Sequence, residues 1–143
     1  MTETQLAEAV ATLLRAVSTA PLSTLEVHVQ DQVGYEDPDG SVTVFIIGGN
    51  EEPEAIGEQF ADEVNLRIVG MIPWADTLAN RQGIETLCKQ IRTILRGDNR
   101  RLSAGGELAT RNTNVAWEYG FTAEGADAKR TCSVTVTYRI RQS

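Results

Sequence analysis

The sequence predicts a single α+β domain over residues 1–143, in which a mixed, mostly antiparallel sheet of about four to five strands is covered on one face by two helices. Two observations support this class. Apolar residues recur at helical spacing in two stretches and alternate with polar residues in four or five others. The order of these stretches is helix, two or three strands, helix, two strands. The composition, 41% hydrophobic and 23% charged, is that of an ordinary globular domain of this length.

The first helix is expected close to the N-terminus. Its apolar residues fall on one helical stripe, namely Leu6, Val10, Leu13, Leu14 and Val17. Thr2 and Gln5 have the three-residue spacing of a capping box, and Pro21 ends the run. The helix is therefore predicted to lie between Thr2 and Pro21.

Three strands are predicted to follow this helix. Residues 25–29 alternate apolar and polar side chains, as a half-buried strand does. Residues 35–40 are rich in turn formers, so we expect the next strand, residues 42–47, to return antiparallel. Residues 48–57 are rich in glycine and acids and are expected to form a loop. A longer third strand is predicted over residues 60–72, where Pro73 closes it.

The second helix is predicted over residues 74–96. Its apolar stripe consists of Ile84, Leu87, Cys88, Ile91, Ile94 and Leu95. Gly97 then occupies the position that commonly ends a helix. The polar residues 98–114, which include two consecutive glycines, are expected to form a loop.

Two strands are predicted after this loop. Residues 115–121 form the first, and the second alternates from residue 131 to residue 141. Its apolar members are Cys132, Val134, Val136, Tyr138 and Ile140, and its polar members are Thr131, Ser133, Thr135, Thr137, Arg139 and Arg141. One face of this strand therefore belongs to the core, and the other faces water or a partner.

Groups that could carry chemistry are few. The single histidine, His28, has the polar parity of its strand. The carboxylate pairs Asp37/Asp39 and Glu51/Glu52 lie in turn-like sequence, where solvated acids are the usual occupants. We find no nucleotide-binding, hydrolase or metalloprotease motif. We therefore expect no catalytic residue, no cofactor and no metal site, and we predict that the chain is not an enzyme.

Four further residues are interpreted structurally. Cys88 and Cys132 lie far apart in the sequence without a CxxC motif, which favours two buried, reduced thiols. Trp74 and Trp117 are interpreted as core or rim anchors, and exposure of either would favour a binding role.

The chain carries one acidic and one basic region. The acids are Glu51, Glu52, Glu54, Glu58, Asp62 and Glu63, and the bases are Arg81, Lys89, Arg92, Arg96, Arg100 and Arg101. One interpretation is that bases in the last turns of the second helix oppose its dipole. The other is that the two regions meet between subunits and close a ring. The candidate interface residues are Glu51, Glu52, Glu54, Glu58, Arg92, Arg96, Arg100 and Arg101.

Charge and hydropathy limit the partners. A net charge of −7 argues against a nucleic-acid-binding surface over the whole molecule. The N-terminal residues lack the basic and apolar regions of a secretion signal, so none is expected. The longest apolar run, residues 44–47, is too short to span a bilayer, so we expect no membrane partner.

Parts of the sequence resemble the tail terminator proteins of tailed phages, and the resemblance is closest to those of contractile, Mu-like tails. It rests on the segment VTVFIIGG at residues 42–49, the strand ending LRIVGM at residues 66–71, and the helix GIETLCKQIRTILRG at residues 83–97. The alternating Thr and Val residues of the final strand add to it.

The resemblance implies a structural virion protein of the phage tail or neck, assembled in the host cytoplasm. Such a protein forms a ring, expected to be a homohexamer, that caps the tail tube and ends its polymerisation. Its partners would be the tail tube, the sheath and the head–tail connector proteins, and DNA would pass through the lumen without specific binding. The resemblance assigns no functional residue to a position in this chain.

Three alternatives stay open from the sequence. A head completion or stopper protein of the phage neck has similar size and elements. A small enzyme or ligand-binding module could use the acidic region of residues 51–63 as a cation or amine site. An adaptor could bury the Thr-rich face of residues 131–141 against another sheet.

Overall fold

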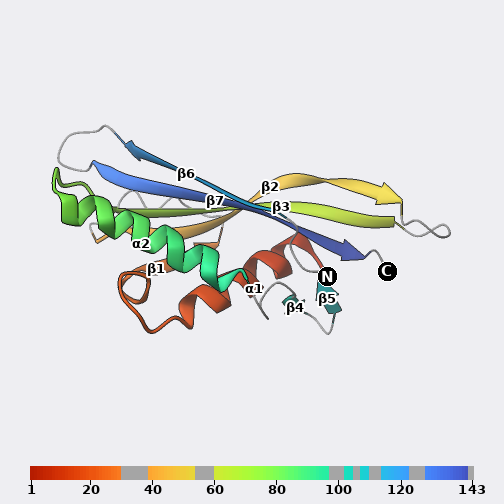
Figure 1. The fold of residues 1–143 in the computed structure, drawn as a ribbon. Coiled ribbons are helices and arrows are strands. Elements are labelled where there is room, and N and C mark those ends of the chain that lie inside the picture. The colour runs from red at the N-terminus through yellow and green to blue at the C-terminus, as the bar shows by residue number, and fades with distance from the viewer. Residues whose placement is uncertain are drawn as a thin grey trace.

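The computed structural model describes residues 1–29, 39–53, 60–96, 102–104, 107–109, 114–122 and 128–141. The elements are α1 (Glu3–Arg15), a 3-10 turn η1 (Leu22–Thr24), β1 (Glu26–Val29), β2 (Ser41–Pro53), β3 (Phe60–Pro73), α2 (Leu78–Ile94), β4 (Leu102–Ala104), β5 (Glu107–Ala109), β6 (Val115–Thr122) and β7 (Lys129–Arg141). The main sheet has the order β1-β2-β3-β7-β6, and both helices lie on one face of it (Figure 1). The predicted fold class is confirmed.

Helix α1 begins where the capping box predicts. The backbone N–H of Gln5 donates to the Thr2 hydroxyl at 3.1 Å, and the Gln5 side chain accepts from the backbone N–H of Thr2 at 2.9 Å. Two of the otherwise unpaired donors at the helix start are thereby satisfied. The predicted apolar stripe is buried except for Leu13 and Val17, which are partly buried.

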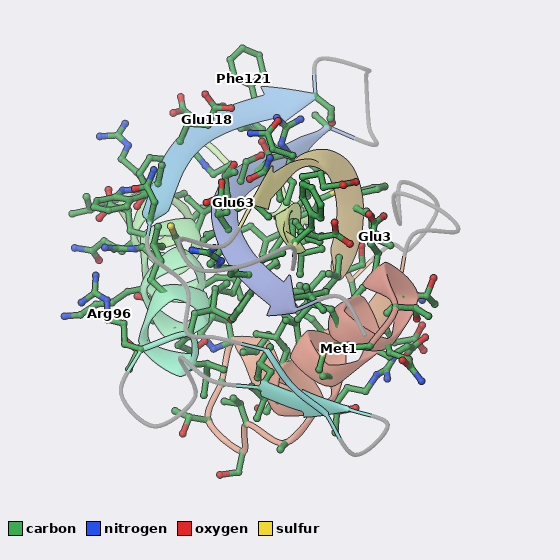
Figure 2. The ribbon with its side chains drawn as sticks, turned by 90° about the vertical axis from the view of Figure 1, so that its right-hand side faces the viewer. Met1, Glu3, Glu63, Arg96, Glu118 and Phe121 are labelled. Carbon is green, nitrogen blue, oxygen red and sulfur yellow. The ribbon has the colours of Figure 1, made fainter. Side chains whose placement is uncertain are left out.

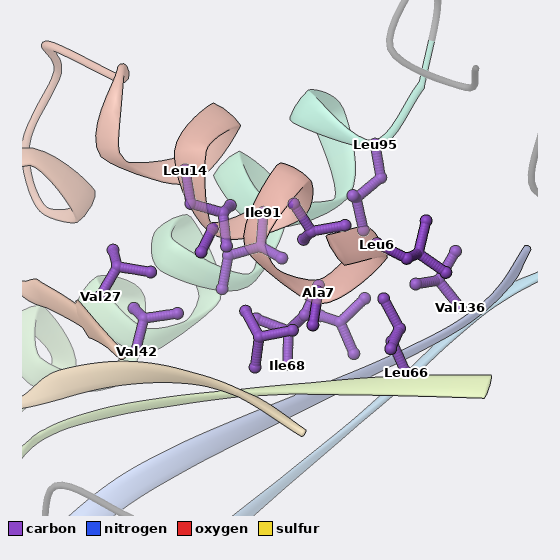
Figure 3. Packing of buried hydrophobic residues seen from close by; sticks show 14 of the residues in the cluster. Leu6, Ala7, Leu14, Val27, Val42, Leu66, Ile68, Ile91, Leu95 and Val136 are labelled. Atoms are coloured by element: carbon purple, nitrogen blue, oxygen red, sulfur yellow. The ribbon is translucent and has the colours of Figure 1, made fainter. Parts of the chain in front are cut away.

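The core lies between the two helices and the sheet (Figure 3). Helix α2 contributes Ile84, Leu87, Cys88 and Ile91, with Leu95 at its C-cap. The sheet contributes alternate residues of its central strands, such as Leu66, Ile68 and Val136. The predicted apolar parity of β7 is confirmed, since Cys132, Val134, Val136, Tyr138 and Ile140 are all buried.

Gly70 lets α2 approach the sheet closely. A Cβ atom at this position of β3 would lie 2.8 Å from Cδ2 of Leu87 and 3.0 Å from Sγ of Cys132. A side chain at this position would therefore force Leu87 to move away from the sheet. At the other flank of α2, the Gln90 side chain accepts from the N–H of Leu22 at 3.0 Å and donates to the carbonyls of Thr19 and Ala20. Gln90 thus fastens the α1–β1 connection to α2.

The first two strands differ from the prediction. β1 pairs with β2 in parallel, from Glu26 opposite Ser41 to Val29 opposite Val44, instead of antiparallel. Both strands begin at the same end of the sheet, so the chain must come back to that end between the last residue of β1 and the first residue of β2. Turn-forming residues indicate that a chain reverses, but they do not show how often it does so.

The expected loop at residues 48–57 is also wrong over its first half. β2 continues to Pro53 and pairs with β3 along its whole length, with a register shift between Ile46 and Gly48. Gly48 has a φ of 122°, which a glycine adopts readily at a bulge. The composition of this segment resembles a loop, but β3 supplies hydrogen-bonding partners for it. Residues 54–57 lie outside the described residues.

The second helix starts later than predicted. Thr77 is its N-cap, since the Thr77 hydroxyl accepts from the N–H of Asn80 at 3.1 Å, so residues 74–77 precede the helix. Residues 98–114 were expected to be a loop, but they include the short β4–β5 hairpin. Gly97 and the remainder of that segment, apart from Asn114, lie outside the described residues.

The two thiols meet between α2 and β7, and both are buried and reduced, as predicted. A hydrogen bond from Cys132 lowers the pKa of the Cys88 thiol to about 6, and Tyr119 and Arg92 act in the same direction against the effect of burial. The same hydrogen bond, together with burial, raises the pKa of Cys132. Because Cys88 has no access to solvent, it is unavailable as a nucleophile despite this acidity.

Truncating the buried stripe of α2 should destabilise the fold. Leu87→Ala is expected to lower the free energy of unfolding by about 2 to 5 kcal/mol, because it removes a fully buried side chain and leaves a cavity. Ile91→Ala should behave in the same way. Leu78→Ala, in the exposed first turn of the same helix, is the control and should stay within about 0.5 kcal/mol of the wild type. Chemical denaturation measures all three, and equal losses at Leu78 and Leu87 would contradict the packing.

The thiol pair predicts a pH titration. In the wild type, the ultraviolet absorbance of a thiolate should appear as the pH rises through about 6. Cys132→Val removes the largest cause of the lowered pKa, so the absorbance should then appear at higher pH. Cys88→Ala should abolish the signal in this range, which assigns it. An unchanged midpoint in a folded Cys132→Val variant would contradict the assignment.

Candidate interaction surfaces

The outer part of the β2–β3 hairpin extends beyond the helices (Figure 1). We call the residues Ile47–Pro53 and Phe60–Val64 the arm. Across its two strands Glu51 lies opposite Asp62, and Asn50 lies opposite Glu63. On its inner side the arm pairs with β7, where Arg139 lies opposite Glu63. Acids therefore concentrate on the arm, and Glu51 is exposed there.

Helix α2 carries a charged stripe along one flank. Its members fall at i, i+4, i+8, i+11 and i+15, which places them on one side of a helix, and they are Arg81, Glu85, Lys89, Arg92 and Arg96. Arg92 shows which side this is, because its guanidinium carbon lies 3.8 Å from the ring centre of Trp117 on β6. The stripe, four cations and one anion, therefore faces the β6 edge of the sheet. Side chains that end in nitrogen atoms gather on this side of α2, and Arg96 is one of them (Figure 2).

Aromatic side chains line the same edge. Trp117, Tyr119 and Phe121 of β6 are 46%, 48% and 65% exposed. Their exposure follows from position, since β6 is the last strand of the sheet order and α2 packs mainly over β7. Burial and a hydrogen bond to Cys88 raise the pKa of Tyr119 to about 12, so its hydroxyl stays protonated at neutral pH.

Two arginines stack on tryptophan rings of this aromatic surface. Arg92 stacks on Trp117, and its buried Nε has no hydrogen-bond partner among the described residues. Arg130 lies 3.9 Å from the ring centre of Trp74, donates to the Asn80 side chain and reaches the Ala75 carbonyl at 3.2 Å. The Trp74 ring in turn lies 5.6 Å from that of Phe121, at a tilt of 49°. We call Trp74, Leu78, Trp117, Tyr119, Phe121 and the charged stripe of α2 the α2–β6 face.

The candidate interface residues from the sequence fall into three groups. Glu51 is exposed on the arm, and Glu52 lies beside it on β2. Arg96 is exposed at the end of α2, whereas Arg92 is half-buried against Trp117. Glu54, Glu58, Arg100 and Arg101 lie outside the described residues. The pair Glu51/Glu52 was expected in a turn, and it lies in a strand instead.

The exposed tryptophans favour a binding role over a core role. Trp74 and Trp117 are 40% and 46% exposed, so neither is a core residue, and their role as rim anchors stays a prediction. The sequence did not identify Tyr119, Phe121 or Leu78 as surface residues. Alternation in residues 115–121 shows a strand with one apolar face, but not that this face is incompletely covered.

Polar side chains also gather beside β1. A shallow groove between α1, η1 and β1 is lined by residues that include Arg15 and His28, and the Arg15 guanidinium there already donates to the Val27 carbonyl at 2.8 Å. His28 lies 3.6 Å from Glu26 at the rim of the sheet. Within the described residues no three His, Cys, Asp or Glu side chains are grouped to hold a metal ion. No helix in this part of the chain is long and apolar enough to cross a membrane.

The fold of this chain is similar to that of known structures. No protein-family model matches the chain, and no curated protein sequence matches it. One similar solved structure, whose name gives no function, has a TM-score of 0.63 and 12% sequence identity, and the match covers 97% of this chain and 92% of that one. A second is a chain from the virion of a native gene transfer agent (GTA) particle, with a TM-score of 0.62 and 16% identity over 96% of both chains. At these identities the likeness establishes the fold, and it does so along nearly the whole chain.

Proposed function

We propose that this chain is a structural subunit of a phage-like particle, and that its specific role is that of a tail terminator. The observation that carries the proposal is the fold match to a chain of the gene transfer agent virion, which covers 96% of both chains. Because the match leaves almost no residue over on either side, it concerns nearly the whole of this chain and not a shared motif. The resemblance of residues 42–49, 66–71 and 83–97 to tail terminators is an independent reason for the finer role.

The surface is arranged for assembly more than for chemistry. The acidic Cys88 thiol is enclosed, and the guanidiniums of Arg92 and Arg130 are stacked on tryptophan rings. The exposed large apolar residues of the described chain, by contrast, lie on the arm and on the α2–β6 face. This arrangement favours a subunit with protein partners, and we propose no enzymatic activity for it.

A tail terminator ends the polymerisation of the tail tube. Each ring of a tail tube offers the next ring the same surface, so a tube has no intrinsic reason to stop. A protein that matches the last tube ring on one side, and presents a different surface on the other, ends the growth. In this role the chain would form a ring, expected to be a hexamer, with the tail tube, the sheath and the head–tail connector as its partners.

The charge of the chain suits a passage for DNA. A ring of subunits with a net charge of −7 each would release few counterions from DNA phosphates. DNA could then move through the lumen without being held there. The protein would reside in the virion, at the junction of tail and head.

Deleting this protein from its particle should change tail length. We expect tails that are overlong or variable and are not joined to heads, because nothing stops the tube or meets the connector. Electron microscopy of the deletion particles measures both properties. Purified protein added to free tubes should cap them at one end only.

Two other outcomes would change the assignment. Tails of normal length that fail to join heads would indicate a head completion or stopper protein of the neck. Tails of normal length that are properly attached would contradict both roles and favour a peripheral adaptor.

A further inference from the structure

We infer that the arm of one copy docks on the α2–β6 face of the next copy, where the outer edge of β2 adds to the open edge of β6. This inference rests on the proposed function, because it specifies how the subunits of such a ring would meet. Three independent properties of the described residues support it: exposed apolar side chains, charge and open strand edges.

Within the described part of the chain, the exposed large apolar residues fall in two places. Seven large hydrophobic side chains are exposed within the described residues, namely Ile47, Phe60, Trp74, Leu78, Trp117, Tyr119 and Phe121. The first two belong to the arm, and the other five belong to the α2–β6 face. An interface buries such residues. On the arm they stand at its two ends, Ile47 at the base and Phe60 opposite Pro53.

The charges of the two places are opposite. The arm carries Glu51 opposite Asp62, with Glu52 adjacent, and none of its residues is basic. The α2 flank presents Arg81, Lys89 and Arg96 as exposed cations, beside the stacked Arg92. Charges of opposite sign across an interface fix the register and exclude wrong partners.

Among the described strands, each place has a strand edge with which no other strand pairs. β1 pairs only with Ser41–Val44 of β2, so among the described strands none lies on the outer side of β2 beyond Val44. β6 pairs with β7 on one side and is the last strand in the order. Unpaired N–H and C=O groups along such edges readily accept another strand. Joining β2 to β6 would make one continuous sheet from two subunits.

A second copy fits this face better than DNA does. The cations of the α2 flank would suit phosphates, but the aromatic side chains and the open β6 edge call for an apolar partner that has its own backbone groups to pair. The arm supplies both, together with the acids. The rest of the chain is acidic and would repel DNA.

The geometry favours a head-to-tail contact. The open edges of β2 and β6 belong to opposite sides of the same sheet, and they differ in sequence and charge. A contact between two different surfaces repeats from copy to copy and closes into a ring when the rotation per copy permits. Each copy would give its arm to one neighbour and receive the arm of the other.

Sedimentation of the purified chain tests the contact. At low salt the wild type should form a discrete multiple of 15.6 kDa, and high salt should weaken it. Glu51→Lys and Arg96→Glu should each raise the dissociation constant by about tenfold or more, and the double variant should recover part of the loss. Phe121→Ser should also weaken assembly and leave folding intact, because the side chain is 65% exposed.

Matched controls make the same charge changes elsewhere. Glu26→Lys lies on β1 opposite Ser41, at the end of β2 away from the arm, and Arg67→Glu is exposed on the face that the helices leave open. Both should assemble as the wild type does. Thermal unfolding of every variant separates a loss of contact from a loss of fold.

Three results would overturn the inference. The first is a wild type that stays monomeric at about 1 mM protein, where even a contact with a dissociation constant of that size would be half formed. The second is equal assembly by the interface and control variants. The third is retention of duplex DNA that Arg96→Glu abolishes without any change in mass, which would assign the α2 flank to DNA.

The inference and the proposed function can fail separately. If charge reversal leaves assembly unchanged but the deletion produces overlong tails, the terminator role stands and the contact lies elsewhere. If the copies join as inferred but the deletion leaves tails normal, the contact stands and the role is wrong.

Discussion

The limited width that α1 and α2 cover on a five-stranded sheet determines which surfaces of this molecule stay exposed. The apolar face of the central strands is buried along its length, from Val64 and Ile140 at one end to Cys132 at the other. α2 packs mainly on β7, where Gly70 lets it approach closely. β6 lies beyond β7 as the last strand of the sheet, so its aromatic side chains stay exposed, and on the arm Ile47 and Phe60 stay exposed.

The periodic elements could be predicted from the sequence because their signals are local. The capping box of Thr2 and Gln5, the stripe of α2 and the alternation in β7 each depend on residues a few positions apart. The parallel pairing of β1 with β2 could not be predicted, since alternation is the same in both orientations. The glycines and acids after Ile46 suggested a loop, although tertiary pairing with β3 holds them in a strand.

The candidate surfaces were predicted only in part. The acidic and basic regions are visible as runs of like charge, and the structure places the described members of the basic region on one flank of α2. The exposed aromatic residues could not be predicted, because their exposure depends on which strands the helices cover. Trp117, Tyr119 and Phe121 alternate as core residues do, and only the position of β6 at the end of the sheet leaves them exposed.

The bulge at Gly48 has a consequence for curvature. It lies at the base of the arm, and bulges increase the local twist of the strand that contains them. The direction in which the arm leaves the sheet is therefore set at a residue whose φ of 122° suits glycine. If copies join arm to edge, that direction determines how far each copy turns relative to the one before it. The number of copies needed to close the assembly would then depend on the backbone conformation at Gly48.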